Sequence, residues 1–88
     1  MNEHILFVID RLANPDKYTQ LELEANKQSA RADDACWDAD AADYAYWAAV
    51  VAACGFSAAA VVAASYWVDE YFVITGEDKQ TYIDKLGE

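Results

Sequence analysis

The sequence contains few of the residues that carry catalysis, metal binding or disulfide scaffolds. Its only histidine is His4, and its two cysteines, Cys36 and Cys54, are too far apart for a redox pair or a pair of zinc ligands. We therefore expect both cysteines to be reduced and buried beside alanine, as small hydrophobic residues. No Ser or Cys has a base at a recognisable spacing. The sequence predicts a non-enzymatic protein with neither a cofactor nor a metal site.

Basic residues are also scarce. Six Lys and Arg residues stand against 16 Asp and Glu residues, and the formal net charge is −10. Proteins that bind DNA or RNA draw their affinity from Lys and Arg, so we expect no direct binding of nucleic acid. The residues before Asp10 contain no positive region of the kind that begins a secretory signal. We therefore expect a cytoplasmic protein with an acidic surface.

Proline and glycine are rare, with one proline and three glycines, and no segment alternates apolar and polar residues with the period of a strand. At 88 residues the chain is short for more than one domain. We therefore predict a single all-α domain over residues 1–88. Its first short helix covers residues 5–12 and stops before Pro15, because the residue that precedes a proline is pushed out of the helical conformation.

Capping patterns predict where the following helices begin. Thr19 and Glu22 form a capping box, and neither glycine nor proline interrupts residues 20–53, so we predict one long helix there of roughly 50 Å. Gly55-Phe56-Ser57 is typical of a tight turn, with Ser57 as the cap of a return helix over about 58–74. A short C-terminal helix follows Asp78.

The sequence is nearly mirror-symmetric about Phe56. The order Tyr, Trp, Ala, Ala, Val, Val at 46–51 returns almost reversed at 61–67. Mirror-related positions of two antiparallel helices meet at the same height, so the pattern predicts an antiparallel helical hairpin with small residues at the contact. Because large aliphatic residues are few, we expect the aromatic residues around the turn to fill the core rather than form a binding surface. These residues are Tyr44, Tyr46, Trp47, Tyr66, Trp67, Tyr71 and Phe72.

The two arms of this hairpin are unequal in length. A return helix over 58–74 covers only the second half of a helix over 20–53, which leaves residues 20–35 without a partner. Either a second copy covers them in a homodimer, or a break near residues 33–38 folds them back within one chain, because aspartate favours helix starts. Both interpretations stay open at this point.

The segment from Tyr44 to Val68 contains no charged residue and is long enough to cross a bilayer. A membrane-inserting hairpin of the kind used by small phage lysis proteins is therefore the alternative function. Against insertion, the segment is mostly alanine, it contains Gly55 and Ser57, and acidic residues rather than Lys or Arg flank it.

One group of charged residues is dense enough to suggest a binding site. Five aspartates fall within about 15 Å of the predicted helix, at roughly one charge per 3 Å, which is close to the phosphate spacing of a DNA strand. Such an edge would imitate nucleic acid and bind a basic groove on a nucleic-acid-handling protein; the alternative is a solvated face that keeps the chain soluble. The candidate partner-binding residues are Asp33, Asp34, Asp38, Asp40 and Asp43. Helical angles divide them between two arcs, which weakens the mimicry interpretation.

Two stretches of the chain carry a resemblance. They are Ile-Leu-Phe-Val-Ile-Asp at 5–10 with Pro-Asp-Lys-Tyr-Thr-Gln at 15–20, and Tyr-Trp-Val-Asp-Glu-Tyr-Phe at 66–72 with Thr-Gly-Glu at 75–77. In these stretches and in its Ala-rich middle, the chain resembles small accessory proteins of temperate phages and prophages of enteric bacteria. The resemblance implies a cytoplasmic, non-essential factor, made in the bacterial host, that acts on a host protein. It assigns a role to no individual residue.

Overall fold

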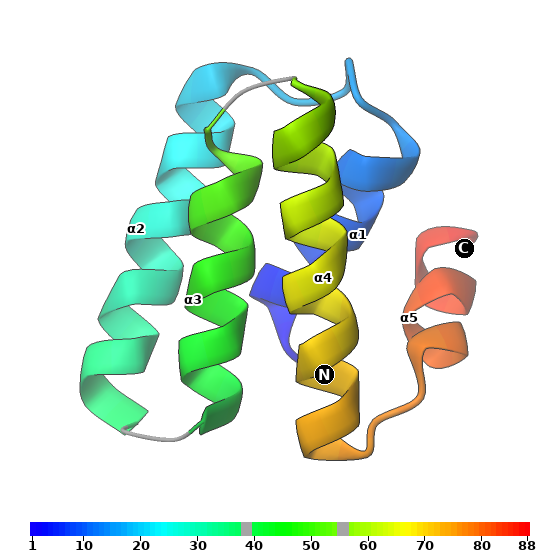
Figure 1. The fold of residues 1–88 in the computed structure, drawn as a ribbon. Helices are drawn as coiled ribbons and strands as arrows, with labels where there is room; N and C mark the ends of the chain where they lie inside the picture. The colour runs from blue at the N-terminus through cyan, green and yellow to red at the C-terminus, as the bar shows by residue number, and fades with distance from the viewer. Residues whose placement is uncertain (38–39, 55–56) are drawn as a thin grey trace.

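The computed structural model describes residues 1–37, 40–54 and 57–88, and every regular element in these ranges is a helix. The elements are α1 (Glu3–Ala13), α2 (Gln20–Trp37), α3 (Asp40–Ala52), α4 (Ala58–Thr75) and α5 (Lys79–Leu86). In Figure 1, α2, α3 and α4 lie side by side, α1 lies behind them, and α5 stands at the edge. The predicted all-α class is confirmed.

Three of the helices, α2, α4 and α5, begin at the predicted caps. Ser57 accepts a hydrogen bond from the Ala60 amide at 3.1 Å, and Asp78 accepts one from the amide of Gln80. The capping box also forms, because the Glu22 amide donates to Thr19 Oγ1 and the Thr19 amide donates to Glu22 Oε1, both at 3.2 Å. These contacts satisfy amide groups that the first turn of a helix leaves without partners.

The predicted helix over 20–53 is wrong. α2 ends at Trp37, α3 begins at Asp40, and the two helices pack against each other. The Gln20 side chain donates to the carbonyl of Ala53 at 2.7 Å, so the two ends of the predicted helix lie in contact. A continuous helix would leave the apolar residues of its first half in water, whereas the reversal buries Leu23 and Ala30. Asp38, in the predicted break, lies outside the described residues.

This reversal decides between the two interpretations of the unequal arms. Residues 20–35 are covered by α1 and α3 of the same chain, so the argument for a homodimer from helix lengths no longer holds. α3 and α4 run in opposite directions: Tyr44 contacts Trp67, and Ala52 lines the same small hollow as Ala60. The predicted turn residues Gly55 and Phe56 lie outside the described part of the chain.

The core combines small residues, chiefly the alanines of α3, with larger residues from α1, α2, α4 and α5. Ala45, Ala48, Ala49 and Ala52 of α3 are buried, together with Ile5 and Val8 of α1, Val68 and Tyr71 of α4, and Tyr82 of α5. α1 contacts each of the other four helices, which makes it the centre of the packing. The small side chains of α3 let three neighbours approach this helix closely.

We expect Ala49→Leu to destabilise the protein by about 1–3 kcal/mol, because the added side chain has no space in this packed contact. Thermal melts of the variant beside wild type measure the effect. Ala32→Leu, at an exposed position of α2, is the matched control and should stay within about 0.5 kcal/mol of wild type. Equal midpoints for the two variants would contradict the packing of α3.

Candidate interaction surface

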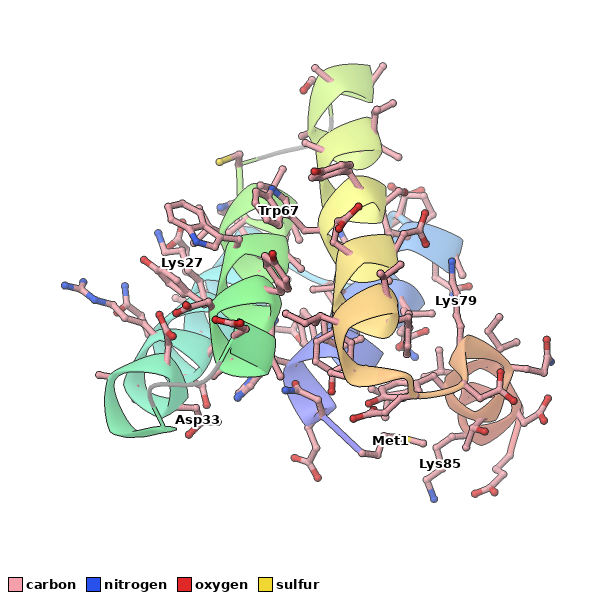
Figure 2. All side chains as sticks on the ribbon, turned by 60° about the horizontal axis from the view of Figure 1, so that its bottom comes forward. Met1, Lys27, Asp33, Trp67, Lys79 and Lys85 are labelled. Atoms are coloured by element: carbon pink, nitrogen blue, oxygen red, sulfur yellow. The ribbon has the colours of Figure 1, made fainter. Side chains whose placement is uncertain are left out.

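Five aromatic rings form a continuous cluster across α3 and α4. Trp67 is its centre and contacts the rings of Tyr44, Trp47 and Tyr66 at centroid distances of 5.5, 6.2 and 5.2 Å. Tyr46 extends the cluster through Trp47, at 5.5 Å. We call these five residues the aromatic surface. Figure 2 shows Trp67 on the side of α3 and α4 that faces away from α1.

The expectation that these rings fill the core is wrong for Trp47 and Tyr66, whereas Tyr44, Tyr46, Trp67 and Phe72 pack against the core while partly exposed. Trp47 and Tyr66 are 46% and 55% exposed, and Tyr44, Tyr46 and Trp67 are half-buried. Of the seven aromatic residues expected in the core, Tyr71 alone is buried. The buried side of α3 is alanine, so the rings of this helix lie beside its packed side, and Trp47 is left exposed.

Carboxylates lie at one end of the aromatic surface. Asp43 is one helical turn before Trp47, and Glu70 is one turn after Tyr66. Because Tyr44 packs on Trp67 in two antiparallel helices, these two carboxylates fall at the same end of the cluster. Among the described residues, no ion pair engages either of them. The surface therefore combines exposed rings with uncompensated negative charge.

A basic residue near this surface is already engaged. Lys27 Nζ lies 2.8 Å from Glu24 Oε2, and this hydrogen bond raises the pKa of Lys27 above its ordinary value of 10.5. Figure 2 shows Lys27 on the same side of the molecule as Trp67. Since its charge is balanced by Glu24, Lys27 does not neutralise the carboxylates at the end of the aromatic surface.

The five aspartates predicted as one binding edge are divided by the reversal. Asp33 and Asp34 lie on α2, Asp40 and Asp43 lie exposed in the first turn of α3, and Asp38 lies outside the described residues. Asp34 is half-buried, and Asp33 is bound to a histidine. Of the four aspartates that the structure describes, only Asp40 and Asp43 form an exposed pair on one helix, and the four do not follow a single helix edge.

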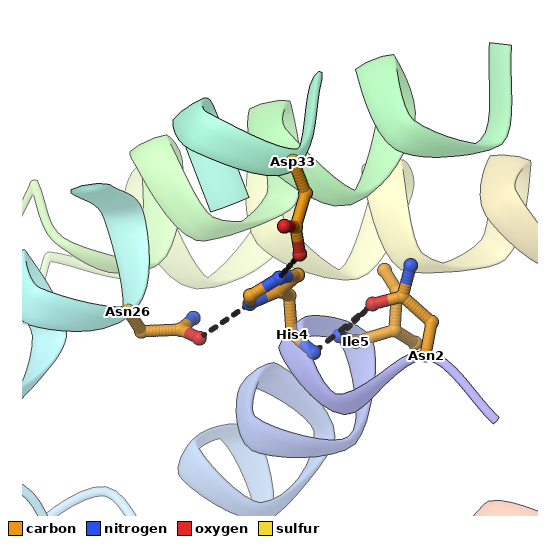
Figure 3. Close-up of polar contacts among 5 residues, drawn as sticks. All are labelled: Asn2, His4, Ile5, Asn26 and Asp33. Carbon is orange, nitrogen blue, oxygen red and sulfur yellow. Dashed lines mark hydrogen bonds and ion pairs between the residues drawn. The ribbon is translucent and has the colours of Figure 1, made fainter. Parts of the chain in front are cut away.

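His4 ties α1 to α2. Its Nε2 atom lies 2.5 Å from Asp33 Oδ2 and its Nδ1 atom lies 3.3 Å from Asn26 Oδ1, as Figure 3 shows. Asn2 caps the same helix by accepting from the amides of His4 and Ile5. Both ring nitrogens of His4 therefore face an oxygen on α2, one from a carboxylate and one from an amide. The sequence spacing, 29 positions between His4 and Asp33, offered no signal for this contact.

A cleft of about 610 Å³ opens beside this tie, between the N-terminal residues and the adjoining ends of α2 and α3. Its polar lining includes Glu3 and Ser29, and its apolar lining includes Ala41 and Ala45. Since Asp33 on its wall is engaged by His4, Glu3 is the carboxylate left to meet a ligand. The other polar side chains of the lining, those of Asn2, His4 and Asp33, are engaged in the hydrogen bonds described above, and the rest of the wall is mostly alanine.

Other kinds of site were sought in the described ranges 1–37, 40–54 and 57–88. No three His, Cys, Asp or Glu side chains there are grouped as a metal site requires. In the same ranges, no helix is both long enough and apolar enough to span a bilayer. The expectation of a buried thiol is wrong for Cys54, which is exposed and donates to the Val50 carbonyl at 3.3 Å. The side chain of Cys36 lies outside the description.

A buried carboxylate holds the loop between α1 and α2. Asp10 is 4% exposed and accepts hydrogen bonds from Lys17 Nζ at 2.6 Å, from Asn14 Nδ2 at 2.9 Å, and from the Tyr18 hydroxyl. Burial alone would raise the pKa of Asp10, but these three donors outweigh it and hold the pKa below its ordinary value of 3.8. This cluster closes the loop, and sequence analysis did not identify it.

We expect Asp10→Asn to lower the free energy of unfolding by about 1–3 kcal/mol at neutral pH, because the amide cannot accept all three bonds. A depressed pKa contributes stability that is present above the ordinary value of 3.8 and is lost as the pH falls through the folded value. The difference between variant and wild type should therefore shrink as the pH falls below 3.8. Denaturant unfolding at several pH values measures it, with the exposed Asp16→Asn as control. A difference that does not change with pH would contradict this assignment.

The aromatic surface is the part of the described molecule most suited to bind a partner. Two exposed rings in a five-ring cluster, with free carboxylates at one end, are the features that distinguish this face from the rest of the described surface. Comparison with protein-family models, with curated proteins and with solved structures gives no match.

Proposed function

We propose that this protein is a small, acidic, non-enzymatic interaction protein that binds a basic segment of a partner protein on its aromatic surface. The observation that carries the proposal is the exposure of Trp47 and Tyr66 within a cluster of five contacting rings. Trp and Tyr dominate the energetics of protein interfaces, because they bury a large area at a low cost in conformational entropy.

The negative charge near the rings favours a partner with basic side chains. Asp43 and Glu70 lie one turn from exposed rings, and the whole chain carries −10. A cationic side chain placed over an indole or phenol ring would gain both the cation–π attraction and the attraction of the carboxylates. Arginine suits this surface best, because its planar guanidinium stacks on aromatic rings and pairs with a carboxylate in a bidentate manner.

The resemblance to phage accessory proteins suggests which kind of protein the partner is. Under that resemblance the partner is a protein of the bacterial host, and a nucleic-acid-handling protein already carries the required basic surface. The mode of binding differs from the mimicry predicted from sequence, since it relies on rings and neighbouring carboxylates rather than on a regular row of aspartates.

Binding to a defined probe tests the proposal. We expect the protein to bind a fluorescently labelled oligo-arginine peptide at low salt, as measured by anisotropy, and to bind it less tightly at high salt. Trp47→Ala should weaken binding at least about tenfold, as truncation of an aromatic hot spot does. The same variants then decide whether a host protein captured from lysate uses this surface.

Charge reversals provide the matched control. Asp43→Lys and Asp84→Lys change the net charge equally, but only Asp43 lies beside the aromatic surface, since Asp84 is on α5. We expect Asp43→Lys to weaken binding more than Asp84→Lys. Equal effects of the two reversals, or no binding at low salt, would refute the proposed site.

A further inference from the structure

His4 lies between two hydrogen-bond acceptors on α2. Its Nε2 atom faces the Asp33 carboxylate at 2.5 Å, and its Nδ1 atom faces the side-chain carbonyl oxygen of Asn26 at 3.3 Å (Figure 3). A neutral imidazole carries one N–H group, whereas the imidazolium ion carries two. The arrangement therefore fits the charged ring, which donates to both oxygens. A neutral ring would leave one bare nitrogen facing one of these oxygens.

The amide nitrogen of Asn26 has no hydrogen-bond partner among the described residues. This atom, Nδ2, is buried. The oxygen and nitrogen of a side-chain amide have nearly the same shape, so a half-turn of the amide exchanges their positions. The half-turn would place Nδ2 against His4 Nδ1, where it can donate to a neutral ring. In each orientation one amide atom meets the ring and the other is unpaired, so the charge of the ring decides between the two orientations.

We propose that His4 and Asn26 form a proton-coupled switch beside the cleft between α1, α2 and α3. In the charged state, His4 Nε2–H donates to Asp33 and Nδ1–H donates to Asn26 Oδ1. The His4 side chain is 13% exposed, so the Nδ1 proton can pass to water. When it does, the Asn26 amide turns over and Nδ2 donates to Nδ1. Nε2 keeps its proton in both states, because the carboxylate of Asp33 faces it and can only accept.

Few other charged groups face the His4 ring. Glu3 and the N-terminal residue Met1 line the same cleft, and Asp33 is the charged residue that α2 adds to it. Among the described residues that line the cleft, those of α3 are alanine, and α4 and α5 contribute none. Asp33 is therefore the charged group in direct contact with the ring, and the proton on Nδ1 is the charge that changes.

The switch changes the charge of the cleft. When the ring is charged, its ion pair compensates Asp33, and Glu3 is the remaining carboxylate. When the ring is neutral, both carboxylates are uncompensated on the wall of a cleft of about 610 Å³. Histidine is the side chain that changes charge between about pH 5 and 8. The cleft therefore becomes more negative as the pH rises through this range, and it then attracts a cation more strongly.

Heteronuclear NMR of the ring and amide nitrogens tests the switch. The sequence contains one histidine, so the ring signals are unambiguous. We expect both ring nitrogens to carry a proton at the acidic end of the titration and Nε2 alone to carry one at the alkaline end. The side-chain NH₂ signals of Asn26 should shift with the same midpoint as the ring signals. Those of Asn14, whose Nδ2 donates to Asp10, are the control and should not follow the ring. Asn26 signals that do not follow the ring, or a neutral ring with its proton on Nδ1, would overturn the proposal.

The substitution Asn26→Asp tests the role of the amide. Its carboxylate accepts from Nδ1–H but cannot donate to a neutral ring, so the midpoint of the ring titration should rise by at least about one pH unit. Ser29→Asp is the matched control. It adds the same charge to the cleft, one helical turn before Asp33, where both ring nitrogens are already engaged, and it should raise the midpoint less. Equal rises would show that charge alone acts on the ring, against the turnover of the amide. The wild-type signals decide the proposal even where a variant does not fold.

Discussion

Leu23→Ala is expected to lower the free energy of unfolding by about 2–5 kcal/mol, which is a large part of the stability of a domain of this size. Leu23 lies on α2 and is 1% exposed. The substitution removes apolar contacts and leaves a cavity between α2 and the helices that cover it. The change would have little effect on a helix that extended into solvent, so the effect tests the reversal between α2 and α3.

Leu21 supplies a matched comparison on the same helix. It lies two positions away, belongs to the same residue type, and is 80% exposed. Leu21→Ala should therefore change stability by no more than about 0.5 kcal/mol. Denaturant titrations of the two variants, with the slope checked for a two-state transition, measure the difference. Similar losses for Leu21→Ala and Leu23→Ala would mean that α2 does not pack as the structure shows.

The starts of α2, α4 and α5 were predictable because each depends on residues within a few positions of one another. Thr19 with Glu22, Ser57 and Asp78 satisfy amides of the helix that they precede, so a local pattern was enough. The end of α2 carries no comparable signal. Residues 20–53 contain no glycine or proline, and only the burial of Leu23 and Ala30 against the rest of the chain favours the reversal.

The orientation of α3 and α4 was harder to predict for a related reason. α3 carries both an alanine stripe and an aromatic stripe, and either stripe can face a neighbour at helical spacing. Because α1, α2 and α4 all pack closely on α3, the small residues of α3 must face them. Trp47 and Tyr66 therefore lie at the surface. The exposure of the aromatic surface therefore depends on how distant helices pack, and the spacing of residues along one helix does not predict that packing.

Contacts between distant residues were also invisible to sequence analysis. His4 meets Asp33 across 29 positions, and Tyr82 meets the backbone of Asn2 across 80. The polar groups involved have ordinary spacings along the chain, so nothing marked them as partners. The opposite holds for the aspartates of residues 33–43. They are close together in the sequence, but the reversal of the chain divides the described ones between α2 and α3.

The C-terminal helix is held by one such cluster, centred on Tyr82. Its ring is buried and meets Phe72 edge-on at 5.0 Å, and its hydroxyl donates to Glu77 and accepts from the Asn2 amide at 2.8 Å. Tyr71 joins the cluster by donating to the other oxygen of Glu77 at 3.0 Å. Burial raises the pKa of both tyrosines above the ordinary value of 10.0, and the hydrogen bonds to Glu77 raise it further, whereas the Asn2 amide acts in the opposite direction on Tyr82.

Tyr82→Ala is expected to lower the free energy of unfolding by about 3–5 kcal/mol, because it removes a buried ring, the donor to one oxygen of Glu77 and the acceptor of the Asn2 amide. Tyr82→Phe keeps the ring and should lose about 1–3 kcal/mol, whereas Tyr66→Phe, at an exposed residue, should lose almost nothing.

A raised pKa contributes stability that is present below about pH 10 and is lost as the pH rises through the folded value. Wild type should therefore lose stability above about pH 10 more steeply than Tyr82→Phe does. Thermal melts across this alkaline range measure both slopes, and equal slopes would show that the Tyr82 hydroxyl is not coupled to folding.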